Sequence, residues 1–227
     1  MLSNPFISKG SVNRGNISLH VETMPNKGPT SPTCRGDFSG FARRVKEIIA
    51  DRCSIIYTDF IVYVGPILES LRMEGIEAVG YYGEMDNISK AESHALWREG
   101  RTQVIVATKA FGMGIDEADI CHIIRHGVPE SLNSWAQELG RAGRDGKPAS
   151  AHIFYDEKDA DNACAWIKDH LRNKAVVDRI LKDFSESWRY IYAHAAGICR
   201  RRVLLDVFGE SSKDASATEI CCDACVQ

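Results

Sequence analysis

Two hydrophobic patterns alternate along the middle of the chain. Short, nearly continuous apolar runs occur at residues 54–57, 78–81, 104–108, 120–124 and 151–155. Between them, apolar residues recur every three or four positions, the spacing of a helix that buries one face, over residues 38–49, a stretch ending at Leu71, 88–98 and 132–139. Short apolar strands that alternate with helices predict an α/β fold with a parallel sheet covered on both faces. In such sheets, ligand-binding loops follow the carboxyl ends of strands, so loops 108–117 and 140–146 are site candidates.

The two ends of the chain depart from this pattern. Residues 1–35 mix Gly, Ser, Pro and Asn around one alternating run at 17–21, which predicts a leading segment with a single strand. From about residue 156 helix follows helix, and a polar stretch then leads into a cluster of cysteines. We therefore expect three parts: a leading segment (1–35), an α/β lobe (36–155) and a helical subdomain (156–227). Large aromatic residues recur at helical spacing in the subdomain, which predicts core positions rather than base-stacking platforms: Trp166, Phe184, Trp188, Tyr190 and Tyr192.

Composition narrows the class of protein. Of 227 residues, 44% are hydrophobic and 26% charged, the balance of a soluble globular protein. No apolar run approaches the roughly 18 residues of a membrane-spanning helix, and the N-terminus has no signal-peptide pattern. The formal net charge of -3 excludes nucleic-acid binding through bulk positive charge, but it leaves room for a local basic groove.

The most specific string is Gln-Glu-Leu-Gly-Arg-Ala-Gly-Arg-Asp-Gly at residues 137–146. Arg141 and Arg144 are three positions apart at the end of a predicted helix, so both side chains project to the same side. Arginine suits phosphate because its planar guanidinium is always charged and can hold two phosphate oxygens at once. The glycines permit close backbone approach. Arg-x-x-Arg alone is more often a solvated helix end, whereas the full string favours a phosphate site.

A second string, Ala-Thr-Lys-Ala-Phe-Gly-Met-Gly-Ile-Asp, occupies residues 107–116 at the end of a predicted strand. A hydroxyl at a strand end followed by two glycines is typical of a loop pressed against a phosphate backbone, although any tight turn could carry the same residues. Residues 116–119 (Asp-Glu-Ala-Asp) spell the magnesium box of motor proteins. They follow a glycine loop rather than an apolar strand, so we interpret them as part of that loop.

Four of the eight cysteines lie near the C-terminus: Cys199, Cys221, Cys222 and Cys225. The spacing of the last two is typical of structural zinc, and Cys199 could approach from a neighbouring helix. Adjacent residues point apart, so joint ligation by Cys221 and Cys222 requires a distorted backbone. The alternative is a set of free thiols. Residues 200–202 (Arg-Arg-Arg) either contact phosphates or pair with Asp206 and backbone carbonyls.

Together, these strings resemble the motif series of RecQ-type DNA helicases. Residues 55–155 resemble the second motor lobe of that family, and residues 156–227 resemble its helical zinc module. The resemblance implies a RecA-like parallel sheet flanked by helices, followed by a small helical zinc-binding subdomain. It also implies an enzyme that couples hydrolysis of ATP with Mg²⁺ to 3′–5′ movement and separation of DNA strands, in replication, recombination or repair. Such an enzyme is intracellular, and nuclear in a eukaryote.

The resemblance assigns roles to single residues. Arg144 matches the arginine finger, with Arg141 and Gln137 as phosphate-sensing neighbours. Gly114 and Asp116 match positions that face the nucleotide. The positions that match contacts to DNA are Thr108, Lys109 and Tyr82, and those that match zinc ligands are Cys199, Cys221, Cys222 and Cys225.

The sequence departs from the family pattern in several places. Phe60 and Ile61 replace a Ser-Arg pair, residues 81–85 lack the family's His, and Glu117-Ala118 replaces a frequent Lys-Pro. Each change affects a polar or backbone contact, but none involves Arg141 or Arg144.

No Gly-x-x-x-x-Gly-Lys-[Ser/Thr] loop occurs in the 227 residues, although such a loop binds ATP in a complete motor. Residues 11–17 resemble the family's Asn-Arg-Pro-Asn stretch at the linker between lobes, with Gly15 in place of Pro. We therefore expect a C-terminal helicase lobe that is inactive alone. Its expected partners are a first lobe, in the same or another chain, and single-stranded or forked DNA. Two alternatives stay open: a non-catalytic module that binds DNA or a helicase, and the second lobe of an RNA-dependent motor.

Overall fold

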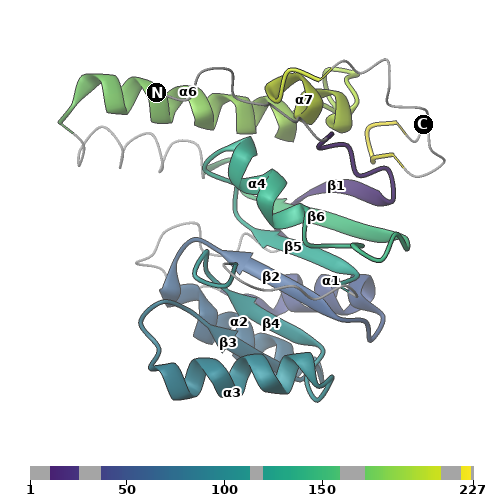
Figure 1. Cartoon of the computed structure of the whole chain (residues 1–227), viewed down its shortest axis with the longest axis vertical. Coiled ribbons are helices and arrows are strands. Elements are labelled where there is room, and N and C mark those ends of the chain that lie inside the picture. The colour runs from purple at the N-terminus through teal and green to yellow at the C-terminus, as the bar shows by residue number, and fades with distance from the viewer. Residues whose placement is uncertain (1–10, 26–36, 113–119, 159–171, 211–220, 226–227) are drawn as a thin grey trace, which may run out of the picture.

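A six-stranded sheet, parallel throughout, forms the centre of the molecule (Figure 1). The computed structural model describes residues 11–25, 37–112, 120–158, 172–210 and 221–225. Across the sheet the strands follow the order β1-β6-β5-β2-β4-β3. Their bounds are Ile17–Thr23 (β1), Ser54–Thr58 (β2), Ala78–Tyr81 (β3), Val104–Ala107 (β4), His122–His126 (β5) and Ala149–Tyr155 (β6). The predicted parallel α/β fold is confirmed.

Helices cover both faces of this sheet. Because side chains alternate along a strand, each strand contributes to two separate cores. Ile56 faces the core under α1 and α2, whereas Ile55 and Tyr57 face the core that includes α3 and α4. The side chains of Asp86 and Ser131 accept backbone N–H groups in the first turns of α3 and α4. The bounds of the helices are Ser39–Ile49 (α1), Ile61–Met73 (α2), Asn87–Arg98 (α3), Leu132–Leu139 (α4), Lys174–Ile191 (α6) and Arg200–Val207 (α7).

The strand predicted at 17–21 is β1, an edge strand of the sheet. It pairs with β6 in register from Ile17 opposite Ala149 to Thr23 opposite Tyr155. On its outer side, the N–H of Leu19 donates to the carbonyl of Cys221 (3.2 Å), and the N–H of Asp223 donates to the carbonyl of Leu19 (3.0 Å). The cysteine segment therefore covers part of an edge that would otherwise present unpaired backbone groups. The division into three parts stays a prediction.

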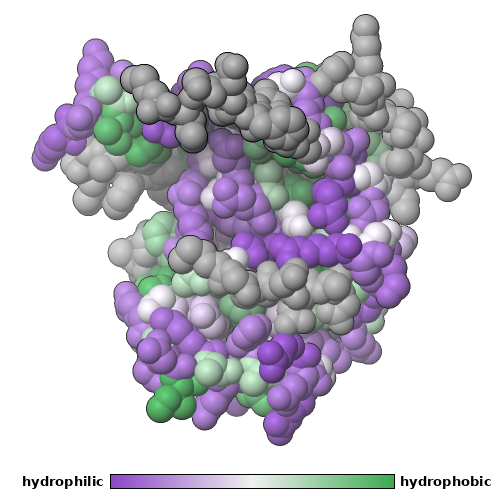
Figure 2. Space-filling view, in the orientation of Figure 1, coloured by the Kyte–Doolittle hydropathy of each residue, from purple (hydrophilic) through white to green (hydrophobic). Residues whose placement is uncertain are grey.

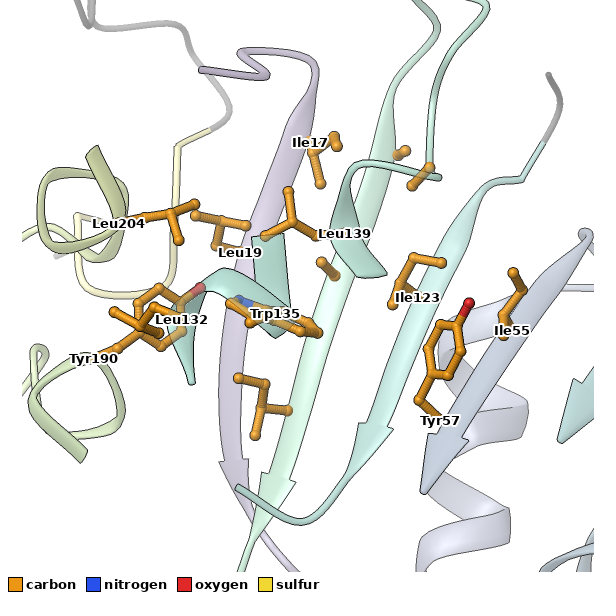
Figure 3. Packing of buried hydrophobic residues seen from close by; sticks show 14 of the residues in the cluster. Ile17, Leu19, Ile55, Tyr57, Ile123, Leu132, Trp135, Leu139, Tyr190 and Leu204 are labelled. Atoms are coloured by element: carbon orange, nitrogen blue, oxygen red, sulfur yellow. The ribbon is translucent and has the colours of Figure 1, made fainter. Parts of the chain in front are cut away.

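Helix α4 lies between the sheet and the C-terminal helices. Its residues Leu132, Trp135 and Leu139 share one core with residues of the sheet, of α6 and of α7. Figure 3 shows Trp135 between Tyr190 of α6 and Ile123 of β5, with Tyr190 and Trp135 both fully buried. One continuous apolar core thus joins the sheet to the helices that follow it.

The aromatic residues of the C-terminal helices differ in burial. Phe184 and Tyr190 are buried, which confirms the prediction of core positions for these two. Tyr192 is 44% exposed and stacks on half-buried Trp188, with ring centroids 5.4 Å apart. For Tyr192 the prediction is wrong, because α6 ends at Ile191 and the buried helical face ends with it. Trp166 lies outside the described residues.

Within the described ranges, no helix is both long and apolar enough to cross a membrane. The face seen in Figure 2 is mainly hydrophilic, and hydrophobic residues form small, separate patches on it.

Candidate functional site

Only one of the two candidate loops follows the carboxyl end of a strand. Residues 108–112 come directly after β4, as predicted. Residues 140–146, here called the arginine loop, instead follow α4 and lead into the amino end of β6. The prediction for this loop is wrong, because β5 and β6 are parallel and α4 returns the chain to the edge where β6 begins.

The two loops nevertheless meet. A β-carbon on Gly112 would lie 2.8 Å from Nη2 of Arg141, so the guanidinium of Arg141 packs directly against this glycine. The N–H of Gly143 donates to the carbonyl of Ile120, with N and O 2.8 Å apart. The connection from β4 to β5 thus contacts the arginine loop on both sides of residues 113–119. Gly114 and Asp116 fall in that range and lie outside the described residues.

Arg141 faces the sheet as well as the turn. Beneath the turn, the hydroxyl of Tyr57 donates to the carbonyl of Phe111 at 3.0 Å. Burial raises the pKa of Tyr57, and the positive charge of Arg141 acts in the opposite direction. Tyr57 therefore stays a protonated donor, and Arg141 lies close enough to act on it electrostatically.

Gln137 and Arg144 occupy exposed positions on either side of Arg141. Gln137, on α4, lines an open pocket of about 300 Å³ together with Arg14, Asn133 and Phe208. Arg144 follows the end of α4 by one turn. Both residues are placed where a group from outside the chain can reach them, unlike half-buried Arg141.

The three residues predicted to contact DNA follow two neighbouring strands at one edge of the sheet. Tyr82 follows β3, and Thr108 and Lys109 follow β4. The N–H of Thr108 donates to the carbonyl of Tyr81 at 3.2 Å, which ties the two strand ends together. Lys109 forms an ion pair with Glu130, and both side chains are about half exposed. Tyr82 is half-buried.

A buried ion-pair group links this edge to α4, and the sequence analysis missed it. Arg125 of β5 donates to both carboxylate oxygens of Asp59 (2.7 and 2.6 Å) and to Oε1 of Glu138 (2.6 Å). Burial alone would lower the pKa of Arg125, but the two carboxylates raise it. Burial raises the pKa of Glu138 to about 7, against the charge of Arg125. The available signal was a charged residue directly after an apolar run, which requires a partner if the strand continues through it.

The four C-terminal cysteines, here called the cysteine cluster, bring their sulfur atoms together. All four Sγ atoms lie within 4.8 Å of one another. The Sγ of Cys222 lies 3.8 Å from that of Cys199 and 3.4 Å from that of Cys225, and the Sγ atoms of Cys199 and Cys221 are 3.4 Å apart. A tetrahedral zinc with bonds of about 2.3 Å separates its sulfurs by about 3.8 Å, so the geometry fits four thiolate ligands. Despite their adjacency, Cys221 and Cys222 both face the cluster.

Arg200 and Arg201 are interior residues. Of the two possibilities for residues 200–202, contact with phosphates or pairing within the protein, these two arginines show the second. Arg200, 2% exposed, pairs with Asp223 and donates to the carbonyls of Tyr190 and Ile191. Arg201, 4% exposed, donates to carbonyls of the leading segment. The predicted partner Asp206 instead binds Arg189, at 3.1 Å.

Comparison with known proteins agrees with this architecture. The model of the helicase conserved C-terminal domain family matches residues 42–146. The ATP-dependent DNA helicase RecQ of Pasteurella multocida is 32% identical over 233 residues, which cover 98% of this chain and 33% of that protein. The ATP-dependent helicase wrn-1 of Caenorhabditis elegans is 32% identical over 230 residues, which cover 100% of this chain and 21% of that protein. The chain therefore spans a third or less of the length of these relatives.

Solved structures show the same fold. A DEAD box protein from Methanococcus jannaschii has a TM-score of 0.54 and 18% identity, over 70% of this chain and 41% of that one. The family match contains the turn at 108–112 and the arginine loop, and the RecQ-type relatives extend the similarity over the cysteine cluster. The chain belongs to the RecQ-type helicases, of which it is the C-terminal motor lobe.

Proposed function

We propose that this chain is the second motor lobe of an ATP-dependent DNA helicase that moves 3′ to 5′. The observation that carries the proposal is the packing of Arg141 against Gly112, which joins the 108–112 turn to the arginine loop. A change at a nucleotide near one loop can therefore reach the other by direct contact. Relatives with this lobe are named ATP-dependent helicases, and about two thirds or more of their length lies outside the matched region.

In this proposal Arg144 is the arginine finger. An arginine placed against the γ-phosphate stabilises the charge of the transition state and contributes about 10³–10⁵ in rate in related phosphoryl transfers. Arg141 and Gln137 sense the same phosphate, and Arg141 passes its position to the 108–112 turn. Gly114 and Asp116 face the nucleotide, which binds with Mg²⁺ between this lobe and a first lobe of the same or another chain.

Thr108, Lys109 and Tyr82 contact the DNA backbone in this proposal. Their common edge suits a strand that runs across the ends of β3 and β4. Such contacts position DNA without reading its sequence. Because phosphate contacts dominate the affinity, binding should be weak, independent of sequence and steeply reduced between about 50 and 200 mM salt. An affinity that stays constant over this range contradicts the assignment.

The cysteine cluster holds a structural zinc ion in this proposal, because four thiolates in tetrahedral reach leave no position for a reactive water. Native mass spectrometry of the purified chain should find one zinc ion. Cys222→Ser should lose the ion, whereas the control Cys53→Ser, outside the cluster, should retain it. Retention of zinc by Cys222→Ser would refute the assignment.

The deciding test is ATPase and strand separation on forked DNA. We expect no turnover from the 227-residue chain and DNA-stimulated turnover once it is fused to the first lobe of a RecQ-type relative. Arg144→Ala should abolish that turnover, whereas Arg101→Gln, at a remote exposed position, should leave it unchanged. Turnover of the Arg144 variant within about twofold of the unmodified fusion removes the finger from the mechanism.

The lack of a Walker loop in the 227 residues favours a second candidate, a non-catalytic module that binds DNA or a helicase. DNA binding by the chain together with an inactive fusion would support that candidate. Stimulation by RNA rather than DNA would indicate an RNA-dependent motor. If the source is a eukaryote, the helicase proposal places the protein in the nucleus, in DNA repair or recombination.

A further inference from the structure

The leading segment binds the backbone of the arginine loop. Arg14 donates from Nη1 to the carbonyl of Gly140 (3.1 Å) and from Nη2 to those of Ala142 (3.0 Å) and Gly143 (2.7 Å). A helix leaves its last carbonyls without intrahelical partners, and these three lie at and just beyond the end of α4. One guanidinium from a distant part of the sequence thus caps the backbone that carries Arg141 and Arg144.

Asn16 holds the same loop on the far side of Arg144. Its Nδ2 donates to the carbonyls of Gly143 and Lys147, at 2.9 Å each. Gly143 has a φ of 56°, and a β-carbon there would overlap the amide of Asn16. The loop backbone is therefore fixed before and after Arg144, while the Arg144 side chain occupies an exposed position.

Arg201 connects the contacts of Arg14 and Asn16 with the arginine loop, here called the brace, to the cysteine cluster. From α7, two residues after Cys199, it donates to the carbonyls of Arg14 (2.9 Å), Ile17 (2.5 Å) and Cys221 (3.3 Å). Arg201 as a whole is 4% exposed, so these bonds are largely shielded from water. Hydrogen bonds of Arg201 therefore connect the carbonyl of Cys221 to the leading segment, and those of Arg14 connect the leading segment to the arginine loop.

We propose that Arg14 is a positioning residue for the arginine finger and that Arg201 anchors Arg14 to the cysteine cluster. The catalytic part of this inference rests on the proposed function. Its physical basis is that a finger acts only within a narrow geometry, and loss of about 1 Å in position can cost about 100-fold in rate. Lysine cannot replace Arg14, because a single ammonium does not offer the planar fork that spans three carbonyls.

Hydrogen exchange on the full chain tests the brace directly. The N–H groups of Arg141, Ala142, Gly143 and Gly146 all donate to backbone carbonyls, so their exchange is slow enough to follow. Arg14→Gln should speed exchange across residues 141–147 by about 10- to 100-fold, because bonds to a charged donor are lost. Exchange in β2, β4 and β5 should stay unchanged. Arg201→Gln should speed exchange in both 12–17 and 141–147, and the control Arg101→Gln in neither.

Kinetics of the fused motor test the positioning role. Arg14→Ala should lower kcat with little change in KM for ATP, since the finger acts in the transition state. Millimolar guanidinium should restore part of kcat, which it would not do for a variant that is merely unfolded.

Several results would overturn the inference. The brace is refuted by loop exchange within about twofold of the unmodified chain, or by equal acceleration throughout the sheet. Local acceleration with normal kcat, while Arg144→Ala still abolishes turnover, refutes positioning and leaves the proposed function standing. If Arg144→Ala has no effect, the assignment of Arg144 as the arginine finger fails, and the positioning role fails with it.

Discussion

Replacement of Arg125 by methionine tests the energetics of the buried charges between β2, β5 and α4. Arg125 is 1% exposed and binds Asp59 and Glu138 through three hydrogen bonds of 2.6–2.7 Å. Methionine fills a similar space without charge and leaves Glu138, 6% exposed, without the guanidinium that binds it. Removal of one member of a buried pair costs about 3–5 kcal/mol, because the remaining charge stays buried.

The cost should depend on pH. Burial raises the pKa of Glu138 from 4.5 to about 7, so the folded state favours its protonated form. The contribution of Glu138 to the free energy of unfolding therefore falls as pH rises from about 4.5 to about 7 in the unmodified chain. Without Arg125 the pKa of Glu138 rises further, and the decline should continue above pH 7 at about 1.4 kcal/mol per unit. Arg125→Met thus costs more at about pH 8.5 than at about pH 6.

Urea unfolding followed by tryptophan fluorescence measures this difference. We would compare the unmodified chain, Arg125→Met and the double variant Arg125→Met/Glu138→Gln at both pH values. The double variant should recover about 2 kcal/mol at the higher pH, because a neutral amide is less costly to bury than a carboxylate. A cost below about 1 kcal/mol, or the same cost at both pH values, would refute the reasoning.

Three further predictions concern stability, each measured by urea unfolding. Gly143→Ala should lower the free energy of unfolding by about 2–3 kcal/mol, because alanine disfavours the positive φ and its β-carbon would overlap Asn16. Gly146→Ala, at φ 80° with open space around it, should lower it by only about 1–2 kcal/mol. Equal losses would contradict the role of the overlap. Trp135→Ala should lower the free energy of unfolding by about 3–5 kcal/mol, because this buried side chain joins the sheet to α6. A loss under about 1 kcal/mol would show that the sheet and α6 do not share one core. Burial lowers the pKa of His126 from 6.5 to about 4, so the contribution of this residue to stability is lost as pH falls from 6.5 towards 4, with a sign opposite to that of Glu138. His126→Phe should remove this contribution, and a pH dependence identical to that of the unmodified chain would mean that His126 does not supply it.

Local sequence pattern predicted most elements of the sheet. Helix α4 has the predicted bounds, because apolar spacing and the Ser131 cap agree. The expected strand at 120–124 is instead His122–His126. A pattern of apolar residues stops at Arg125, but the strand continues because Asp59 and Glu138 neutralise that arginine inside the fold. No local period carries this information, since the partners are 66 and 13 residues away.

The sequence by itself determined the family, the strings at 107–116 and 137–146 and the four cysteines, because each is a set of residue types at short spacing. Tertiary structure decided how they are assembled. It placed β1 at the sheet edge, moved the arginine loop to the amino end of β6 and brought Arg14 to carbonyls 126–129 residues away. It also turned Arg200 and Arg201 inward as hydrogen-bond donors. The physical reason is that a buried polar group is most stable when the fold brings a partner near it, and for Arg14 and Arg201 those partners are distant in the sequence.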